Sequence, residues 1–127
     1  MVNAISEFSG VSVDDLNAAK EFYTKTLGLK IDNEEMGLHF SLPSGGSLFI
    51  YEKENHEPAT YTYLNFAVKN IDETVDSLVE QGVVFEKYEG FDMDDKGIAR
   101  GLSANQGPDI AWFTDPAKNI IAVLQDS

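Results

Sequence analysis

Few side chains in this sequence are suited to catalysis or to metal binding. Histidine, the usual general acid or base near neutral pH, occurs only as His39 and His56, and cysteine is absent. A thiol nucleophile, a disulfide and a zinc–thiolate centre are therefore excluded. The single arginine, Arg100, has a guanidinium that could clamp a carboxylate or phosphate. An ion pair with one of the 22 acidic residues is the simpler interpretation of Arg100.

The two histidines differ in their sequence surroundings. His39 alternates with Leu38 and Phe40, so it is expected on the opposite face of the strand from those apolar side chains. That opposite face could be the one that lines a cavity. His39 is the one candidate for a catalytic residue, and a hydrogen-bonded or exposed structural histidine is the preferred interpretation. His56 lies in the polar segment 53–60 and is predicted to be a surface residue.

One acidic run resembles the start of a calcium-binding loop. It extends from Asp92 to Gly97, but Lys96 holds the fifth position and Ser103 holds the twelfth, where a bidentate glutamate belongs. Calcium is therefore not expected. The sequence also contains no nucleophile motif, phosphate-binding loop or dinucleotide fingerprint.

Aromatic and apolar residues provide a different kind of candidate site. A long polar loop is expected over residues 90–101, and it carries Phe91, Met93 and Ile98. Such loops are often lids or binding loops. Aromatic walls with acidic neighbours suit a flat or cationic ligand. The aromatic candidates are Tyr51, Tyr63, Tyr88, Phe91 and Trp112. For Trp112, a core position is an equally good interpretation.

Length and charge narrow the classes of partner. A chain of 127 residues is expected to form a single domain with a real core. The net charge of −13 disfavours nucleic acid, which is bound through Lys and Arg. The overall field favours a cationic ligand, but solubility is the preferred interpretation of the charge. The longest apolar runs are too short to span a membrane, and the start does not resemble a secretory signal. A cytoplasmic location is expected.

Hydrophobic periodicity predicts two successive sets of elements. The first contains strands at 4–13, 29–33, 37–42 and 47–52, with a helix that begins after Asp14 or Asp15 and ends at Gly28. After a linker at 53–60, the second contains strands at 63–68, 83–87, 110–114 and 120–125. Its helix begins at Asn70, with Glu73 in a variant capping box, and ends at Gly82. The helical positions Leu16 and Ile71 are separated by 55 residues, as are Val13 and Val68, so the halves form an internal repeat.

Alternation along the first strand of each set assigns its faces. The apolar alternates, which end at Val13 and Val68, are expected to face the helices. The opposite face is expected to carry Phe8, Gly10 and Ser12 in the first set and Tyr63, Asn65 and Ala67 in the second. Small and polar residues on this face indicate an open pocket, and a solvent-exposed sheet face would give the same pattern.

The last strand pair carries the most distinctive motif. Residues 110–114 and 120–125 flank the turn Asp115-Pro-Ala-Lys-Asn119, in which proline presets φ and Asn119 is expected to accept the left-handed region. The phrase from Trp112 to Gln125 resembles the closing hairpin of the vicinal oxygen chelate superfamily, which includes glyoxalases, extradiol dioxygenases and bleomycin resistance proteins. Asp15-Leu16 and Leu27-Gly-Leu29 extend the resemblance across nearly the whole chain.

The resemblance implies a fold and a set of metal-ligand positions. The fold is α+β, with two tandem βαβββ modules (about 1–52 and 61–127) forming an open barrel-like cavity with helices outside. In metal-dependent members, His or Glu ligands occupy four cavity-facing positions. These fall on Phe8, Tyr63, Phe49 and Ala122. A divalent ion needs several converging N or O donors, so no metal is expected. A register slip would substitute Glu7, Tyr51 or Glu52, again without a cluster of ligands.

Three functions follow from these observations. The leading hypothesis is a metal-free protein of the glyoxalase/bleomycin resistance type that binds and sequesters a small cationic or aromatic molecule, without a cofactor and as a homodimer. One alternative is a glyoxalase-like lyase or isomerase that uses His39, Tyr63 or Glu52 with an atypical metal site. The other is an acidic protein-interaction module. The predicted pocket residues are Phe8, Ser12, His39, Phe49, Tyr51, Tyr63, Asn65, Phe91, Arg100, Trp112 and Ala122.

Overall fold

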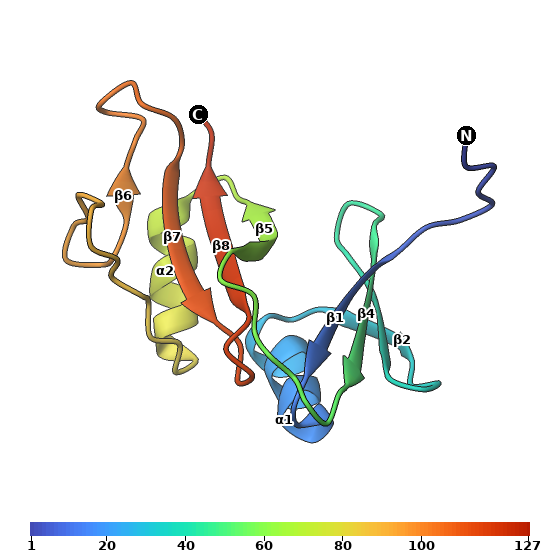
Figure 1. Cartoon of the computed structure of the whole chain (residues 1–127). Coiled ribbons are helices and arrows are strands. Elements are labelled where there is room, and N and C mark those ends of the chain that lie inside the picture. Colours follow the sequence, from blue (N-terminus) through green and yellow to red (C-terminus); the bar gives the residue numbers. More distant parts are fainter. The chain divides into compact units, whose positions relative to one another are not determined.

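A computed structural model describes all 127 residues and divides them into two compact units. Unit 1 comprises Met1–Pro58 and unit 2 comprises Ala59–Ser127, so the boundary falls inside the predicted linker. Each unit contains one four-stranded sheet and one helical region (Figure 1). The predicted α+β class and the two tandem modules are confirmed. No helix combines the length and the apolar character needed to cross a membrane.

Unit 1 forms its sheet in the order β1-β4-β3-β2. The first strand pairs in parallel with the last, and the remaining pairs are antiparallel. This order places β4 beside β1, so residues from both ends of the module share one sheet. The elements are β1 (Ser9–Val13), α1 (Leu16–Glu21), the π-helical segment η1 (Phe22–Thr26), β2 (Lys30–Asn33), β3 (Leu38–Ser41) and β4 (Ser47–Glu52).

Unit 2 repeats this topology with the order β5-β8-β7-β6. Here β5 is parallel to β8, and β8 lies between β5 and β7. The helix α2 packs on one face of the sheet, against β7 and β8 (Figure 1). The elements are β5 (Thr62–Ala67), α2 (Ile71–Glu80), β6 (Ala99–Arg100), β7 (Asp109–Thr114) and β8 (Ile120–Gln125).

Both helices begin with the same pair of caps. The Asp15 side chain accepts a hydrogen bond from the Ala18 amide at 3.1 Å, and the Asn70 side chain accepts one from the Glu73 amide at 3.0 Å. A second donor at each helix start bonds to the last residue of the module's final strand. The Leu16 amide donates to Glu52 Oε1 at 3.0 Å, and the Ile71 amide donates to Gln125 Oε1 at 2.9 Å. The internal repeat is therefore preserved at the level of individual hydrogen bonds.

The buried side chains alternate along the strands and meet the helices. On β7, Ala111 and Phe113 are buried while Trp112 is half-buried. The buried positions of α2 are Ile71, Val75 and Leu78. In unit 1, Leu38 and Phe40 are buried and His39 is half-buried, as the alternation predicts. Period-2 alternation on the strands thus separates the core face from a second face that carries the candidate residues.

One predicted strand of unit 2 is wrong. Residues 83–87 form no ladder, and Val84 is 80% exposed. The segment has one backbone bond to the sheet, from the Glu86 amide to the Trp112 carbonyl at 2.8 Å. The strand beside β7 is β6, which lies inside the segment that was expected to be a loop, and Ile98 next to it is fully buried. The segment that pairs with β7 is thus the one next to buried Ile98, although residues 83–85 are also apolar and have a higher preference for strands.

Smaller corrections concern element ends and one histidine. The first strand begins at Ser9 rather than at residue 4. The first helix changes to π-helical geometry from Phe22 to Thr26. His56 was predicted at the surface but is half-buried. Its Nδ1 lies 2.6 Å from Ser12 Oγ.

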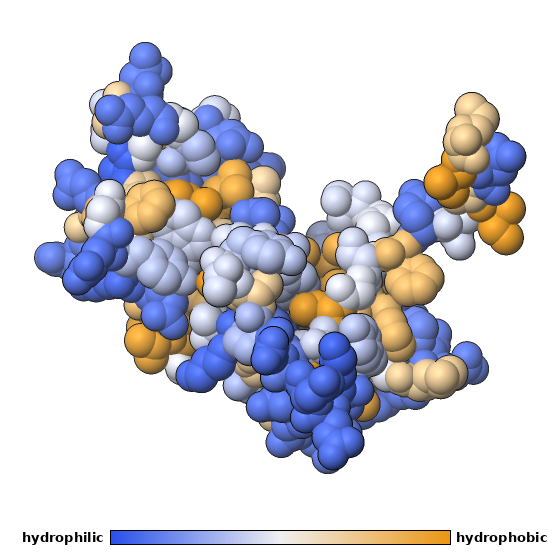
Figure 2. Space-filling view, in the orientation of Figure 1, coloured by the Kyte–Doolittle hydropathy of each residue, from blue (hydrophilic) through white to orange (hydrophobic).

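Hydrophilic residues cover most of the face seen in Figure 2. Hydrophobic areas interrupt this face in several places, and in the N-terminal segment Met1, Val2 and Ile5 are almost fully exposed. These three apolar side chains contribute nothing to the core of unit 1.

The turn between β7 and β8 is organised by a buried carboxylate. Asp115 Oδ1 accepts hydrogen bonds from the amides of Ala117 and Asn119, both at 2.9 Å, and Asp115 Oδ2 accepts one from Asn119 Nδ2 at 3.0 Å. All three residues are buried. The left-handed residue is Lys118, with φ of 71°, and not Asn119 as predicted. Asn119 serves instead as a donor to the carboxylate.

We expect Asp115→Ala to lower the free energy of unfolding by about 3 kcal/mol, because it leaves buried N–H donors without an acceptor. Urea denaturation followed by circular dichroism measures the effect. Asp14→Ala, at an exposed position, is the control and should change the free energy by less than about 0.5 kcal/mol. An unchanged midpoint for Asp115→Ala would show that the hairpin does not depend on its carboxylate.

Candidate functional site

Equivalent strand positions carry the candidate residues in both units. In unit 1, Phe49 of β4 pairs with Gly10 of β1 on one side and with His39 of β3 on the other. In unit 2, Ala122 of β8 pairs in the same way with Asn65 of β5 and Trp112 of β7. Each trio forms a row across its sheet. Trp112 therefore occupies in unit 2 the place that His39 occupies in unit 1.

The row of unit 1 lies in an aromatic cluster centred on Phe49. The Phe49 ring lies 4.6 Å from the His39 ring, 5.7 Å from the Tyr51 ring and 6.2 Å from the Phe8 ring, measured between centroids. Phe8 is 66% exposed. A hollow of about 210 Å³ adjoins Phe8, His39 and Phe49 and also contacts the acidic residues Glu7 and Asp32. Four of the predicted pocket residues are thus brought together by ring contacts, and three of them, Phe8, His39 and Phe49, line the hollow.

His39 is held in place by one hydrogen bond and one ring contact. Its Nε2 lies 2.8 Å from the backbone carbonyl oxygen of Glu35, and its ring is packed on Phe49. A carbonyl acceptor fixes the ring as a hydrogen-bond donor at Nε2. The hydrogen bond thus sets the tautomer and the orientation of the ring. Ser12, the fifth predicted residue of unit 1, bonds to His56.

Unit 2 contains an aromatic corner formed by Tyr88, Phe91 and Trp112. The Trp112 ring lies 5.1 Å from the Phe91 ring at 57° and 5.6 Å from the Tyr88 ring at 69°. Phe91 is 54% exposed, and Trp112 and Tyr88 are half-buried. Steeply inclined rings of this kind form walls rather than a flat stack. The corner therefore presents ring faces and edges to the adjoining space.

Two hollows adjoin this corner and share Phe91 and Trp112. The larger, of about 760 Å³, also contacts Met93, Asp94 and Arg100. The smaller, of about 330 Å³, contacts Tyr61, Tyr88 and Ile120, together with two threonines. One side of the corner is thus apolar with hydroxyl groups, and the other carries charged residues.

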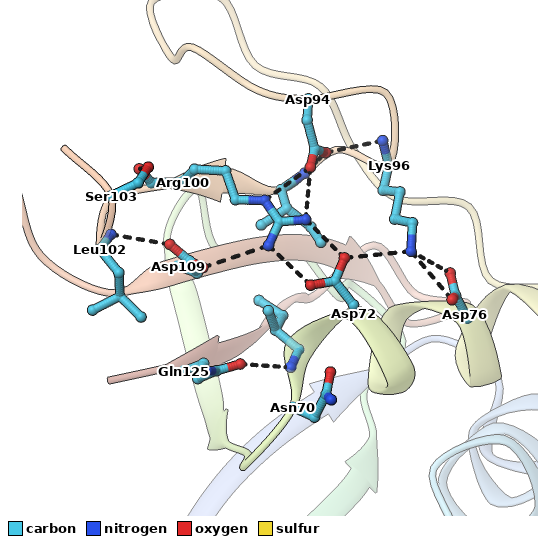
Figure 3. Close-up of polar contacts among 12 residues, drawn as sticks. Asn70, Asp72, Asp76, Asp94, Lys96, Arg100, Leu102, Ser103, Asp109 and Gln125 are labelled. Carbon is cyan, nitrogen blue, oxygen red and sulfur yellow. Dashed lines mark hydrogen bonds and ion pairs between the residues drawn. The ribbon is translucent and has the colours of Figure 1, made fainter. Parts of the chain in front are cut away.

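Arg100 joins three elements of unit 2 through its guanidinium. It bonds to both carboxylate oxygens of Asp72 on α2, at 2.7 and 3.0 Å, and to Asp94 Oδ2 at 2.9 Å (Figure 3). Asp109 Oδ2, at the start of β7, lies at 3.5 Å. This geometry favours the ion-pair interpretation of Arg100. Its guanidinium N–H groups, which could have bound an anionic ligand, already donate to carboxylates of the chain.

Lys96 extends the network along α2. Its Nζ lies 3.3 Å from Asp72 Oδ1 and 3.0 Å from Asp76 Oδ1 (Figure 3). Hydrogen bonds from Arg100 are the main cause that lowers the pKa of Asp72 to about 2. Lys96 lowers this pKa further, while burial raises it by less than Arg100 lowers it. The bond to Asp76 raises the pKa of Lys96. The lowered pKa of Asp72 and the raised pKa of Lys96 keep both groups charged at neutral pH.

Two further groups of unit 2 have shifted pKa values. Burial, which on its own would raise the pKa of Asp94, is outweighed by hydrogen bonds from the Ile98 amide and Arg100, so the pKa is lowered. Burial raises the pKa of the Tyr88 phenol, and the nearby Glu86 charge adds to the shift. Tyr88 is therefore a neutral ring that can serve as a hydrogen-bond donor.

The four positions that the resemblance assigns to metal ligands do not fit a metal ion. Phe8, Phe49 and Ala122 have no nitrogen or oxygen in their side chains, and Tyr63 has only a phenol. Ala122 is fully buried. No group of three or more His, Asp or Glu side chains is arranged to hold a metal ion. The donor set is therefore unsuitable for a divalent cation.

Sequence reasoning located some of these features and missed others. Within unit 2, Phe91, Arg100 and Trp112 line one hollow, and Asn65, Ala122 and Trp112 share a row. Tyr63 lies at an irregularity of the β5–β8 pairing. The acidic partners of Arg100 were not predicted, since no spacing rule links residues 72, 94 and 109. Tyr61 was missed because it directly follows the predicted linker.

Comparisons with known proteins identify relatives of this architecture. A model of the Glyoxalase/Bleomycin resistance protein/Dioxygenase superfamily matches residues 4–123. The structure is similar to a superfamily member from Sphaerobacter thermophilus DSM 20745, with 22% identity, a TM-score of 0.71, and coverage of 98% of this chain and 100% of that one. At these levels of identity, similarity to a solved structure establishes the fold alone.

Two further solved structures have names that refer to antibiotics. The fosfomycin resistance protein FosX from Listeria monocytogenes has 18% identity and a TM-score of 0.69, with coverage of 100% of this chain and 96% of that one. TnmS3, an antibiotic binding protein from Streptomyces sp. CB03234, has 23% identity and a TM-score of 0.65, with coverage of 98% of each chain. No curated protein matches the sequence.

The charge network predicts a specific response to acid. The pKa of Asp72 is lowered from 3.8 to about 2 in the folded chain, so its stabilising contribution is complete above about pH 4 and is lost as the pH falls toward 2. We expect the urea midpoint of the wild type to fall more steeply between pH 4 and pH 2 than that of Asp72→Asn.

Glu73→Gln is the matched control, since it removes an acid from the same first turn of α2. It should retain the wild-type pH dependence. Parallel curves for wild type and Asp72→Asn would contradict the coupling of Asp72 to Arg100.

Proposed function

The chain belongs to the glyoxalase/bleomycin resistance protein/dioxygenase superfamily, and we propose that it is a metal-free protein that binds and sequesters a small organic molecule. The observation that carries the proposal is the aromatic corner of Tyr88, Phe91 and Trp112, with a hollow on either side. Pockets for small molecules are typically apolar and aromatic with a few polar groups. This corner has that composition.

The residues at the ligand positions support binding without a metal. Ala122 contributes a buried methyl group beside Trp112, and Phe49 contributes a ring beside His39. Neither pair can polarise a carbonyl or activate water through a bound cation.

The lyase or isomerase alternative would use His39, Tyr63 or Glu52. The Nε2 of His39 lies 2.8 Å from a backbone carbonyl oxygen, and Glu52 Oε1 accepts a hydrogen bond from the Leu16 amide. What supports binding is the aromatic corner, which offers ring faces and no cluster of metal-ligand side chains.

The ligand class follows from the rings and the charge. A flat molecule can stack on Trp112 or Phe91, and a positive charge on it would interact favourably with the ring faces. The overall charge of −13 acts in the same direction. TnmS3, whose name describes antibiotic binding, provides a precedent within the fold for holding a drug-like molecule. We assign this chain a flat aromatic ligand, with a cation preferred to an anion.

A homodimer is part of the same proposal. The exposed apolar side chains of the N-terminal segment, Met1, Val2 and Ile5, would gain from burial against a second copy. Sedimentation velocity at micromolar concentration distinguishes a dimer from a monomer of 14.0 kDa.

The aromatic corner can be tested with one intrinsic reporter, because Trp112 is the only tryptophan. Proflavine, a flat cation, is expected to quench Trp112 emission saturably at 150 mM salt, and acridine-9-carboxylate, a flat anion, is expected to bind more weakly. Phe91→Ala should weaken proflavine binding about tenfold through loss of a stacking wall.

Val79→Ala is the control for this experiment, since Val79 is an exposed apolar residue of α2 outside both hollows. Its affinity for proflavine should equal that of the wild type. Equal affinities for Phe91→Ala and wild type would remove the corner from the proposed site.

The metal-free character can be tested by thermal melting. Zn²⁺, Ni²⁺, Mn²⁺ or Fe²⁺ at a few equivalents should leave the melting temperature unchanged, because a ligand stabilises a fold only through a site in the folded state. Protein purified without chelator should contain less than stoichiometric metal by elemental analysis. A saturable rise in melting temperature with one of these ions would overturn this part of the proposal.

A further inference from the structure

We propose that Asp72, on the helix outside the hollows, is a positioning residue for the binding site: through Arg100 it holds the segment 91–100 that supplies Phe91. This inference rests on the proposed function, since it concerns the same site. The Asp72 carboxylate binds the Arg100 guanidinium through both oxygens, at 2.7 and 3.0 Å (Figure 3). Such a two-point contact fixes orientation as well as distance.

The segment that carries Phe91 is itself organised around Asp94. Asp94 Oδ1 accepts hydrogen bonds from the amides of Lys96 and Ile98, both at 2.9 Å, and the Asp94 amide donates to the Ile98 carbonyl at 2.9 Å. Met93 also forms a bridge with Ala99. Residues 93–99 therefore form a small preformed loop, with Ile98 as its buried end and Asp94 as its link to Arg100.

Arg100 connects this loop to the rest of unit 2. Its Nε donates to Asp94 Oδ2 at 2.9 Å, while its other nitrogens reach Asp72 on α2 and Asp109 on β7. The guanidinium thus links the loop's organising carboxylate to the helix. A change at Asp72 reaches Phe91 and Met93 through Arg100 and Asp94 without any contact with the hollow.

Two anchors hold the segment, and they respond differently to salt. Ile98 is fully buried, so its apolar anchor is unaffected by ionic screening. The side chains of Asp72 and Arg100 are 44% and 34% exposed, so their attraction is weakened as the Debye length shortens from about 10 Å at 0.1 M salt. Added salt should therefore loosen the Phe91 side of the loop while the buried side keeps its place.

This arrangement has a consequence for an uncharged ligand. Salt normally has little effect on the binding of a neutral aromatic molecule, or strengthens it by favouring apolar burial. Here salt should weaken binding, because it disorders a wall of the site. Neutral acridone is a suitable probe, since it is flat and fluorescent and has no charge that salt could screen.

The experiment measures acridone affinity at 50 and 500 mM NaCl together with acrylamide quenching of Trp112 in the ligand-free protein. For the wild type we expect affinity to fall about three- to fivefold between the two salt concentrations, with a parallel rise in quenching. Asp72→Asn should show the weaker affinity and the higher quenching already at 50 mM NaCl, with no further response to salt.

Two variants act as controls. Glu73→Gln removes an acid from the same helical turn without touching Arg100, so it should behave as the wild type. Asp72→Glu keeps a carboxylate and should retain most of the salt response. Should Asp72→Asn fail to fold, Arg100→Lys provides a second test, because it keeps the charge and loses the two-point contact. Higher Trp112 quenching than in the wild type at 50 mM NaCl is expected for it, and wild-type quenching would overturn the positioning role.

The two readouts separate failure of this inference from failure of the proposed function. If acridone does not bind the wild type but Trp112 quenching still rises with salt and with Asp72→Asn, the positioning role stands and the ligand class is wrong. If Asp72→Asn matches Glu73→Gln in quenching and in salt response, the positioning role is overturned, whatever binds.

Discussion

The register of the β7–β8 hairpin is the constraint on which the site of unit 2 depends. β8 lies between β5 and β7, so a slip of one residue in its pairing would turn Trp112 and Ala122 toward α2 and the core residues toward the open face. The buried Asp115 carboxylate fixes that register by accepting three hydrogen bonds across the turn. Unit 1 forms the same turn at residues 42–46 with backbone bonds alone and a glycine, Gly45, at the left-handed position.

The repeated fold places different chemistry on equivalent positions. In unit 1 the central strand contributes a large ring, Phe49, which packs on His39, and the adjoining hollow is small. In unit 2 the central strand contributes only the methyl group of Ala122, and the large ring is Trp112 on the neighbouring strand. Trp112 is then free to contact Phe91 from the loop, with a larger hollow beside it. The largest ring of the row therefore lies on the central strand in unit 1 and on the neighbouring strand, β7, in unit 2.

The sequence predicted what local rules determine and missed what tertiary pairing determines. The caps Asp15 and Asn70, the strand alternation at His39 and the closing hairpin follow from short-range preferences, and each is confirmed. The strand at 83–87 was wrong, since its apolar residues favour a strand but the place beside β7 is taken by β6. The contact of His56 with Ser12 joins residues 44 positions apart. Hydrophobic periodicity reports local structure only, so it could not predict this contact.

The charges around Arg100 explain why the single arginine does not make the site attractive to anions. Four carboxylates, from Asp72, Asp76, Asp94 and Asp109, surround two cations, Arg100 and Lys96. The cluster retains a negative charge, and the depressed pKa values of Asp72 and Asp94 keep those carboxylates ionised at neutral pH. An anion entering the larger hollow would have to compete with carboxylates already bound to the guanidinium. A neutral or positively charged aromatic molecule meets no such competition, so the arginine acts on ligand choice by shaping the wall rather than by binding the ligand.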